Sequence, residues 1–392
     1  MSAVDRTRAD APRVLAIADV EQSYVAAWRV HAPLAALKRA GRVADYTVTD
    51  ATLVGLPRRG AYDVVWLQRA ADDKLTQRLI DLRPGGFLFD ADDHLLCRPA
   101  YIHAEEFPAA STVTEALEAA RVVTVTSRRL GGLLADRAVS SPSVVGLSSD
   151  LEAKTVVCPN AADFAGTLPR RPAQPQVLLL TQGHRLALGV SAEPVLTAVA
   201  DFAAAHALPI CYFGQPLESL SPLAARLLRG VVRAGEMPLE RYQGLLAALP
   251  PMLAVAPLET AGDPATVEFV AGKSDVKMLE YGGWGHPGVY SDAPPYAESD
   301  LACGALAANT YEAWTDALER MWSDGWRVVA AEQEDVRRRR DISVVAADSW
   351  ARALDAARLD VPLDCREVAR AADRFSAAVR SVRARAAWRL SH

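Results

Sequence analysis

The sequence predicts an α/β protein in which two Rossmann-like domains face each other across a cleft and a helical tail follows them. Short apolar runs alternate with stretches of helical periodicity twice along the 392 residues, a pattern typical of parallel sheets covered by helices. Three prolines within 166–175 cannot continue a helix or a central strand, and they interrupt the alternation. We therefore expect domains at 1–165 and 176–345, a linker at 166–175, and a C-terminal helical tail at 346–392 that packs back on the protein.

The expected strands of the first half are short runs rich in β-branched and aromatic residues. They lie at 13–19, 44–50, 62–68, 86–92, 122–127 and 155–161, and helices are expected over 24–41, 72–83, 111–120 and 128–137. Pro33 falls inside the first of these helices, so we expect the helix to kink or begin afresh there.

The second half repeats the alternation. Strands are expected at 176–183, 209–215, 231–237, 252–258 and 287–292, and helices over 192–208, over 239–249 and from Ser274 onward. In such sheets ligands bind beyond the carboxyl ends of the strands, and the space between two domains is a favoured pocket. The sequence therefore directs the search for a site to the strand ends that face the cleft.

Composition excludes several classes of function. The net charge of −5 gives no global basic field that would attract nucleic acid. No apolar run approaches the ~20 residues that a membrane span needs, and the charged first residues lack the apolar region of a secretory signal. The five cysteines are scattered and form no CxxC pair, which argues against a disulfide framework or a zinc site. We expect reduced cysteines in a cytoplasmic protein.

The C-terminal residues are basic. Residues 366–392 carry seven arginines against Glu367 and Asp373, and apolar residues recur there at helical spacing. This pattern predicts a basic amphipathic helix. Its arginines are either solvated on a helix that packs against the protein, or in peripheral contact with an anionic membrane at its inner face.

Lysine is rare in this chain except in one window. Only five of the 43 basic residues are lysines, and Lys273 and Lys277 lie within five residues of each other. Ser274 is a good N-cap for a helix whose first amides would attract an anion. Two cations beside that helix start would hold a diphosphate, and Glu280, on the same helical face, could accept hydrogen bonds from a ribose diol. The alternative is that Lys277 and Glu280 form an ordinary surface pair.

The stretch EFVAGKSDVKMLEYGGWGHPGVYSDAPPY at 268–296 resembles the donor-site signature of GT-B glycosyltransferases of the retaining family 4 type and their KSxxKxLEY relatives. YDVVWLQR at 62–69, followed by FLFDADDHLL at 87–96, is similar to the N-terminal domain of the same proteins. VTVTSRRLGGLL followed by VVCPNAADF, and then residues 305–324, continue the likeness in the same order. The resemblance covers most of the chain.

The resemblance implies a bacterial-type glycosyltransferase of polysaccharide or glycoconjugate biosynthesis, without a cofactor or metal. It would transfer a hexosyl group with retention from a nucleotide-sugar to a glycan, lipid-linked or small-molecule acceptor. The leaving diphosphate would assist deprotonation of the acceptor while the protein stabilises its charge. The donor-binding residues would be Gly183, His184, Lys273, Ser274, Lys277 and Glu280. Lys277, Glu280, Asp92 and Asp93 would be catalytic, and Tyr24, Arg29, Arg69 and His94 would lie on the acceptor side. Surface or packing roles are equally open for Tyr24 and Arg29, and Arg69 could equally pair with Asp72 or Asp73.

The chain departs from the family pattern at one position. The family has a carboxylate eight residues before the equivalent of Glu280, and this chain has Gly272 there. Glu268 and Glu259 are the candidates to replace that carboxylate in contacting the donor sugar.

Two groups of alternatives stay open. Asp90, Asp92, Asp93 and His94 follow a strand, and an Asp-x-Asp pair is how GT-A glycosyltransferases bind Mg²⁺ or Mn²⁺, although those enzymes have one compact domain. We instead expect these acids to line the acceptor side of the cleft or to cap the following loop, with Asp92 or Asp93 as a candidate base. The rival functions are a GT-B nucleotide-sugar epimerase and a non-catalytic nucleotide-sugar-binding or scaffold protein.

Overall fold

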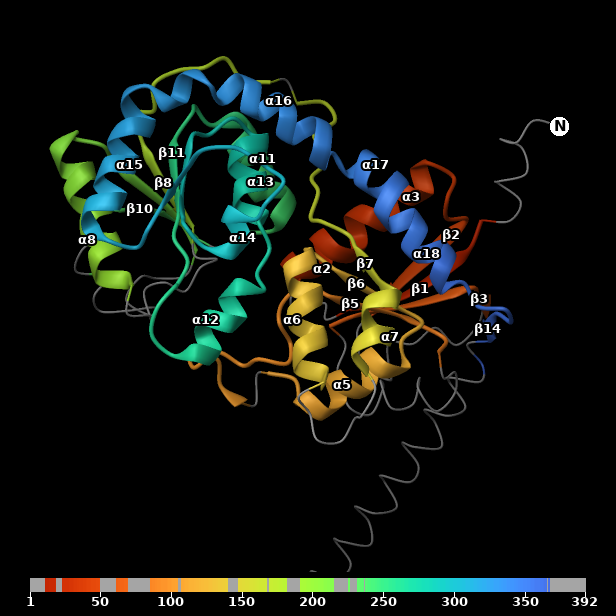
Figure 1. The fold of residues 1–392 in the computed structure, drawn as a ribbon. Coiled ribbons are helices and arrows are strands. Elements are labelled where there is room, and N and C mark those ends of the chain that lie inside the picture. Colours follow the sequence, from red (N-terminus) through yellow and green to blue (C-terminus); the bar gives the residue numbers. More distant parts are fainter. Residues whose placement is uncertain are drawn as a thin grey trace, which may run out of the picture.

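The computed structural model describes residues 11–18, 23–49, 61–69, 85–104, 107–139, 147–167, 169–181, 191–214, 225, 231–235, 237–364 and 366. Within these residues the chain forms two six-stranded sheets and one two-stranded ladder (Figure 1). The strands of both large sheets are parallel throughout, which confirms the predicted pair of Rossmann-like α/β units. We call the part built on the sheet nearer the N-terminus the first domain and the other part the second domain.

The first sheet has the strand order β2-β1-β4-β5-β6-β7. Its strands are β1 (Arg13–Ala18), β2 (Asp45–Thr49), β4 (Val64–Gln68), β5 (Leu88–Ala91), β6 (Val122–Val125) and β7 (Thr155–Val157). The central strands are buried along their whole length, because α5 (Ala110–Ala119), α6 (Arg128–Val139) and α7 (Leu147–Lys154) cover one face and α3 (Ala32–Arg39) lies on the other. Each predicted strand has its counterpart here, whereas the helix expected over 72–83 lies outside the described residues.

The first helical segment changes its winding ahead of Pro33. It begins as α2 (Ser23–Ala26), passes through a π-helical turn at Ala27–His31 and continues as α3 (Ala32–Arg39). Proline cannot donate a backbone hydrogen bond, and its ring clashes with the carbonyl four residues earlier. The interruption expected at Pro33 is therefore observed as a π-helical turn just before it.

The second sheet has the strand order β10-β9-β8-β11-β12-β13. Its strands are β8 (Leu178–Thr181), β9 (Ile210–Phe213), β10 (Val232–Ala234), β11 (Leu253–Ala256), β12 (Gly288–Ser291) and β13 (Ala305–Ala307). Helices α8 (Ala192–Ala205) and α15 (Tyr311–Ser323) pack on one face, and α11 (Leu239–Ala248), α12 (Pro264–Ala271), α13 (Val276–Gly283) and α14 (Pro294–Ala297) lie on the other side. The strand β13 at the sheet edge is not among the predicted strands.

The chain returns to the first domain near its C-terminal end. After α16 (Val329–Arg340) on the second domain come α17 (Ile342–Val345), a π-helical turn (Ala346–Trp350) and α18 (Ala351–Ala357), all packed on the first sheet (Figure 1). Residues 342–345, assigned to the second domain by the prediction, thus lie on the first. Trp350 stacks on Trp66, with ring centroids 4.5 Å apart.

The last described segment closes onto the first domain. β14 (Leu363–Asp364) pairs antiparallel with β3 (Ala61–Tyr62). Apart from Arg366, the basic residues of 366–392 lie outside the described residues, as does the helix predicted there. Among the described helices, none combines the length and apolarity required to cross a bilayer.

Candidate active site at the domain contact

Helix α13 carries the predicted donor-side residues, and it begins one residue later than the sequence predicts. Asp275, not Ser274, occupies the N-cap position, and its side chain makes no capping bond. The Asp275 carboxylate instead accepts hydrogen bonds from Arg340 at 2.7 Å and from the Ser299 hydroxyl at 2.6 Å. Ser274 Oγ accepts from the Asn160 side-chain amide at 3.0 Å, so this hydroxyl serves a contact between the domains.

Lys277 and Glu280 form the ion pair that their spacing allows, but the pair is buried. Lys277 Nζ lies 2.5 Å from Glu280 Oε2, and the Glu280 side chain has no exposed surface. Tyr242 Oη donates to the same oxygen at 3.2 Å, and Tyr24 Oη donates to Glu280 Oε1 at 2.8 Å. The surface-pair alternative is therefore wrong. Because buried charges must be paired and hydrogen-bonded, Glu280 depends on these three partners.

Tyr24 brings the first domain onto this carboxylate. The sequence places Tyr24 on the acceptor side, whereas in the structure its hydroxyl reaches the donor-side Glu280. Burial, followed by the charge of Glu280, raises the pKa values of Tyr24 and Tyr242 well above the ordinary value. Both phenols therefore stay protonated and act as hydrogen-bond donors.

Lys273 lies in the turn before α13, whose first residue is Val276. Its Nζ lies 3.5 Å from Asp93 Oδ1 in the first domain and 4.8 Å from the centre of the Phe269 ring. The expectation that all three residues share one helical face is therefore wrong for Lys273, because it precedes the helix.

Asp92 and Asp93 are both paired with Arg69. The guanidinium contacts both oxygens of Asp92, one of them at 2.9 Å, and also contacts Asp93. Arg69 has a φ of 49°, a left-handed conformation that is strained for a residue with a side chain. The strand β4 thus ends in a turn that aims Arg69 at the acids following β5.

The two acids differ in their proton affinity. Burial raises the pKa of Asp92 in spite of the opposing charge of Arg69. Burial acts on Asp93 too, but the charges of Lys273 and Arg69 outweigh it and lower the pKa. A divalent cation at Asp90 and Asp92, the Asp-x-Asp pair of the sequence, would have to compete with Arg29 and Arg69, which already bind these carboxylates.

Arg29 has a structural role that corrects its predicted place on the acceptor side. Its side chain is fully buried, and it binds both oxygens of Asp90, at 2.6 and 3.1 Å. The remaining donors reach the Cys158 carbonyl at 2.6 Å and Asn160 Oδ1 at 3.1 Å, and Trp350 covers the guanidinium. An acceptor cannot reach a guanidinium that is enclosed in this way.

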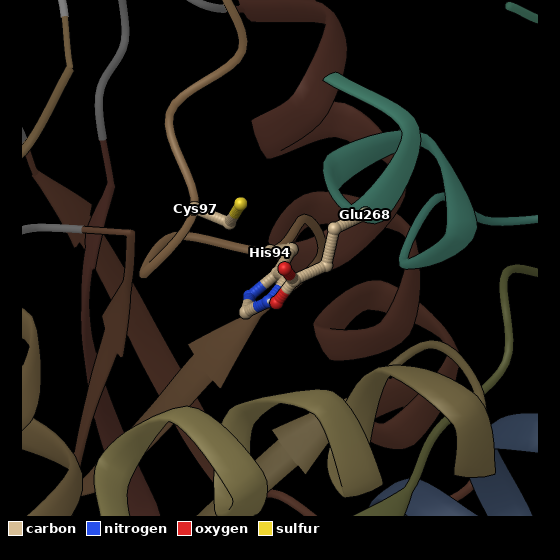
Figure 2. A group of neighbouring side chains, drawn as sticks. All are labelled: His94, Cys97 and Glu268. Atoms are coloured by element: carbon tan, nitrogen blue, oxygen red, sulfur yellow. Dashed lines mark hydrogen bonds and ion pairs between the residues drawn. The ribbon is translucent and has the colours of Figure 1, made fainter. Parts of the chain in front are cut away.

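His94 is also buried, and it links the two domains. Figure 2 shows the His94 ring from the loop after β5 against the Glu268 carboxylate from α12, with Nε2 and Oε1 3.0 Å apart. Arg137 of α6 binds the same carboxylate through two nitrogens, one of them at 2.6 Å. These hydrogen bonds, those from Arg137 foremost, lower the pKa of Glu268 to about 2. The Glu268 carboxylate is therefore engaged in the contact between the domains.

The packing of His94 also explains Gly272, the residue that stands where the family pattern has a carboxylate. A Cβ on Gly272 would lie 2.9 Å from the Cβ of His94 and 3.2 Å from Leu130 Cδ1. A glutamate cannot occupy this position while His94 packs there. Glu259 offers no replacement from its own loop, because it accepts from the Ser191 amide at 3.0 Å at the start of α8, from the Ser191 hydroxyl, and from the Ala261 amide at 2.9 Å.

One side-chain group among the described residues has the donor atoms for a metal. Single ligand atoms of His94, Cys97 and Glu268 lie within 4.8 Å of one another (Figure 2). A set of nitrogen, sulfur and oxygen suits a borderline ion such as Zn²⁺. However, Arg137 already supplies a positive charge to Glu268, and its Nη2 lies 4.0 Å from Cys97 Sγ. Burial also raises the pKa of the Cys97 thiol, so the group is a poor fit for a metal.

The structure thus gathers Tyr24, Asp92, Asp93, Arg69, Lys273, Ser274, Lys277 and Glu280 along the domain contact and sets Arg29 apart from it. Gly183 and His184 lie outside the described residues. Sequence reasoning missed Tyr242, Arg137 and Asn160 as contributors. Asn160 lies in the quoted VVCPNAADF segment and could have been found there, whereas Tyr242 and Arg137 carry no local signal.

Comparison with solved structures identifies the fold as GT-B. HepE of Anabaena, solved with UDP and glucose, is 15% identical, with a TM-score of 0.60 over 88% of this chain and 99% of that one. Sucrose-phosphate synthase of Thermosynechococcus elongatus is 13% identical, with a TM-score of 0.58 over 88% and 99%. A glycosyltransferase of Rickettsia africae is 10% identical, with a TM-score of 0.55 over the same shares. No family model and no curated protein matches the chain by sequence.

Proposed function

We propose that this chain is a glycosyltransferase that moves a sugar from a nucleotide-sugar to an acceptor, with retention and without a metal. The observation that carries the proposal is the buried Lys277–Glu280 pair in α13 on a GT-B fold, with Lys273 in the turn that precedes the helix. HepE, which shares the fold, has been solved with UDP and with UDP-glucose. The resemblance of residues 268–296 to the family 4 donor-site signature supports the same assignment.

In this proposal the second domain binds the donor. Lys273 and Lys277 hold the diphosphate with the first amides of α13, and Glu280 accepts hydrogen bonds from the ribose. In the reaction the bond from the anomeric carbon to the diphosphate oxygen breaks, and a bond from that carbon to the acceptor oxygen forms on the same face. The acceptor proton passes to the leaving diphosphate, whose charge Lys277 stabilises.

Metal independence is supported by the pairing of the acids. Arg69 alone already pairs with both Asp92 and Asp93, and Lys273 and Lys277 would supply the charge that Mg²⁺ would otherwise bring to the diphosphate. The raised pKa of Asp92 makes it the better of the two acids to relay the acceptor proton to the leaving diphosphate. We propose a glycan, lipid-linked or small-molecule acceptor beside these acids.

The test is calorimetric titration with UDP, GDP, dTDP, ADP and their sugars, each with and without EDTA. We expect one nucleotide to bind in the presence of EDTA, and binding to weaken at least tenfold in Lys277→Ala. Lys38→Ala is the matched control, because Lys38 also pairs with a carboxylate, Asp45 at 2.8 Å, but does so on the surface. Release of free nucleotide from the bound donor then reports transfer. Absence of binding by every nucleotide would exclude the proposal.

The second candidate is a non-catalytic nucleotide-sugar-binding protein. Gly272 favours it, because the family carboxylate at this position is replaced by packing against His94. Donor binding without release of nucleotide over a panel of acceptors would support this candidate. A GT-B epimerase would instead convert the donor sugar without an acceptor. Contact of the basic C-terminal residues with an anionic membrane stays a prediction, which cosedimentation with phosphatidylserine vesicles tests.

A further inference from the structure

The donor-side residues of α13 and its preceding turn are held by side chains of the first domain. Within the part of the chain that the structure describes, three polar contacts join the two groups. They are Tyr24 Oη to Glu280 Oε1 at 2.8 Å, Asn160 Nδ2 to Ser274 Oγ at 3.0 Å, and Lys273 Nζ to Asp93 Oδ1 at 3.5 Å. The first domain therefore engages the same polar groups that the proposed site would offer to the donor.

Two of these first-domain side chains offer the same functional groups as a nucleoside diphosphate, a hydroxyl and an anionic oxygen. The hydroxyl of Tyr24 donates to Glu280, as a ribose hydroxyl would. The carboxylate of Asp93 presents an anion to Lys273, as a phosphate oxygen would. Both contacts cross between the domains, so they also hold the second domain against the first.

These contacts compete with donor binding, because they occupy the atoms that the donor would have to reach. Glu280 has no exposed surface, and Tyr24 covers its Oε1 while Lys277 and Tyr242 take Oε2. A ribose can therefore reach this carboxylate only when the Tyr24 hydroxyl gives way. The contacts of Glu268 with His94 and Arg137 lie outside this exchange and can keep the domains together.

We propose that Tyr24 and Asp93 are intramolecular stand-ins for the donor, which a nucleotide must displace to bind. This inference rests on the proposed donor site. It assigns Tyr24 an effect opposite to that of a donor-contacting residue. Removal of its hydroxyl strengthens nucleotide binding, whereas removal of a ligand-contacting hydroxyl weakens it.

Tyr24→Phe tests the inference with little change in packing. The variant keeps the ring, whose centroid lies 6.4 Å from that of Tyr242, and loses the hydroxyl that donates to Glu280. We expect the Kd for UDP to fall about tenfold, which corresponds to about 1.4 kcal/mol. Tyr311→Phe is the matched control, because Tyr311 Oη also donates to a carboxylate, Asp201 at 3.1 Å, but does so on outer helices of the second domain.

A second measurement needs no nucleotide. Amide hydrogen exchange at the start of α13 should be faster in Tyr24→Phe than in the wild type and unchanged there in Tyr311→Phe, because a bond between the domains is lost. A Kd for UDP that is unchanged or higher in Tyr24→Phe would overturn the inference. If the wild type binds no nucleotide, the proposed function fails and the donor-mimicking role fails with it. If the exchange rates at the start of α13 are also the same in Tyr24→Phe and in the wild type, Tyr24 does not couple the domains.

Discussion

Asp90→Asn is expected to destabilise the first domain strongly. Asp90 is fully buried and accepts hydrogen bonds from Arg29 at 2.6 and 3.1 Å and from Thr124 at 2.7 Å. The substitution keeps the shape of the side chain but removes its charge, so the buried Arg29 guanidinium loses its only charged hydrogen-bonding partner among the described residues. Removing one partner of a buried ion pair costs about 3–5 kcal/mol, because the remaining charge is left uncompensated.

Urea unfolding followed by tryptophan fluorescence measures this loss. Trp350, which stacks on Trp66, has the Arg29 guanidinium 4.7 Å from its ring, so two of the eight tryptophans report on this part of the molecule. The midpoint is the quantity to compare, since two-domain proteins often do not unfold in one step. With a slope of about 3 kcal/mol/M, the midpoint should fall by about 1 M or more.

Asp45→Asn is the control for this prediction. Asp45 pairs with Lys38 at 2.8 Å, and the two side chains are 55% and 50% exposed. An exposed pair of this kind contributes only about 0–1 kcal/mol, so its loss should move the midpoint little. Equal midpoints in the two variants would refute the structural role of Arg29. Loss of transfer in Arg29→Lys at an unchanged midpoint would restore its acceptor-side assignment.

Three further predictions concern the second domain and its contact with the first. Gly272→Ala should lower the thermal midpoint, because a Cβ 2.9 Å from that of His94 overpacks the contact by about 1–3 kcal/mol, and an unchanged midpoint would contradict this geometry. Arg137→Ala should return the pKa of Glu268 from about 2 toward about 4.3, which carboxyl NMR titration measures directly. Burial, with the charge of Arg170, lowers the pKa of His286 to about 3. The unfolded chain therefore binds this proton first, and stability should fall as the pH drops from about 6.5 toward 3; His286→Gln should flatten that part of the profile.

The sheets could be predicted because their strands are short, apolar and bounded by turns. Leu178–Thr181 and Leu253–Ala256 are buried on both faces, and such runs stand out in a sequence. The edge strand Ala305–Ala307 has weak β propensity and is partly exposed, so it left no comparable signal. Pairing of Leu363–Asp364 with Ala61–Tyr62 joins residues that are distant along the chain, which local patterns cannot reveal.

The sequence predicted which residues belong to the candidate site, but not which side chains of the other domain they contact. The window from Lys273 to Glu280 was recognised from its composition, and Lys277 and Glu280 do pair. The local preference of serine for an N-cap was overridden, because Asn160 of the first domain engages the Ser274 hydroxyl. Tyr24 and Glu280 are 256 positions apart, and no helical or strand spacing relates them.

The two places where the chain crosses between the domains lie side by side. Ala162 on the outward crossing forms a parallel bridge to Asp341 on the return: its amide donates to the Arg340 carbonyl at 3.0 Å, and its carbonyl accepts from the Ile342 amide at 2.8 Å. Arg340 reinforces the junction by donating to the Asn160 carbonyl at 3.1 Å. Two backbone segments tied together in this way should limit the relative motion of the domains to rotation about one axis and oppose twisting or sliding. The opposing surfaces should therefore separate and meet again in the same register each time, and cleavage of one strand alone would not release either domain.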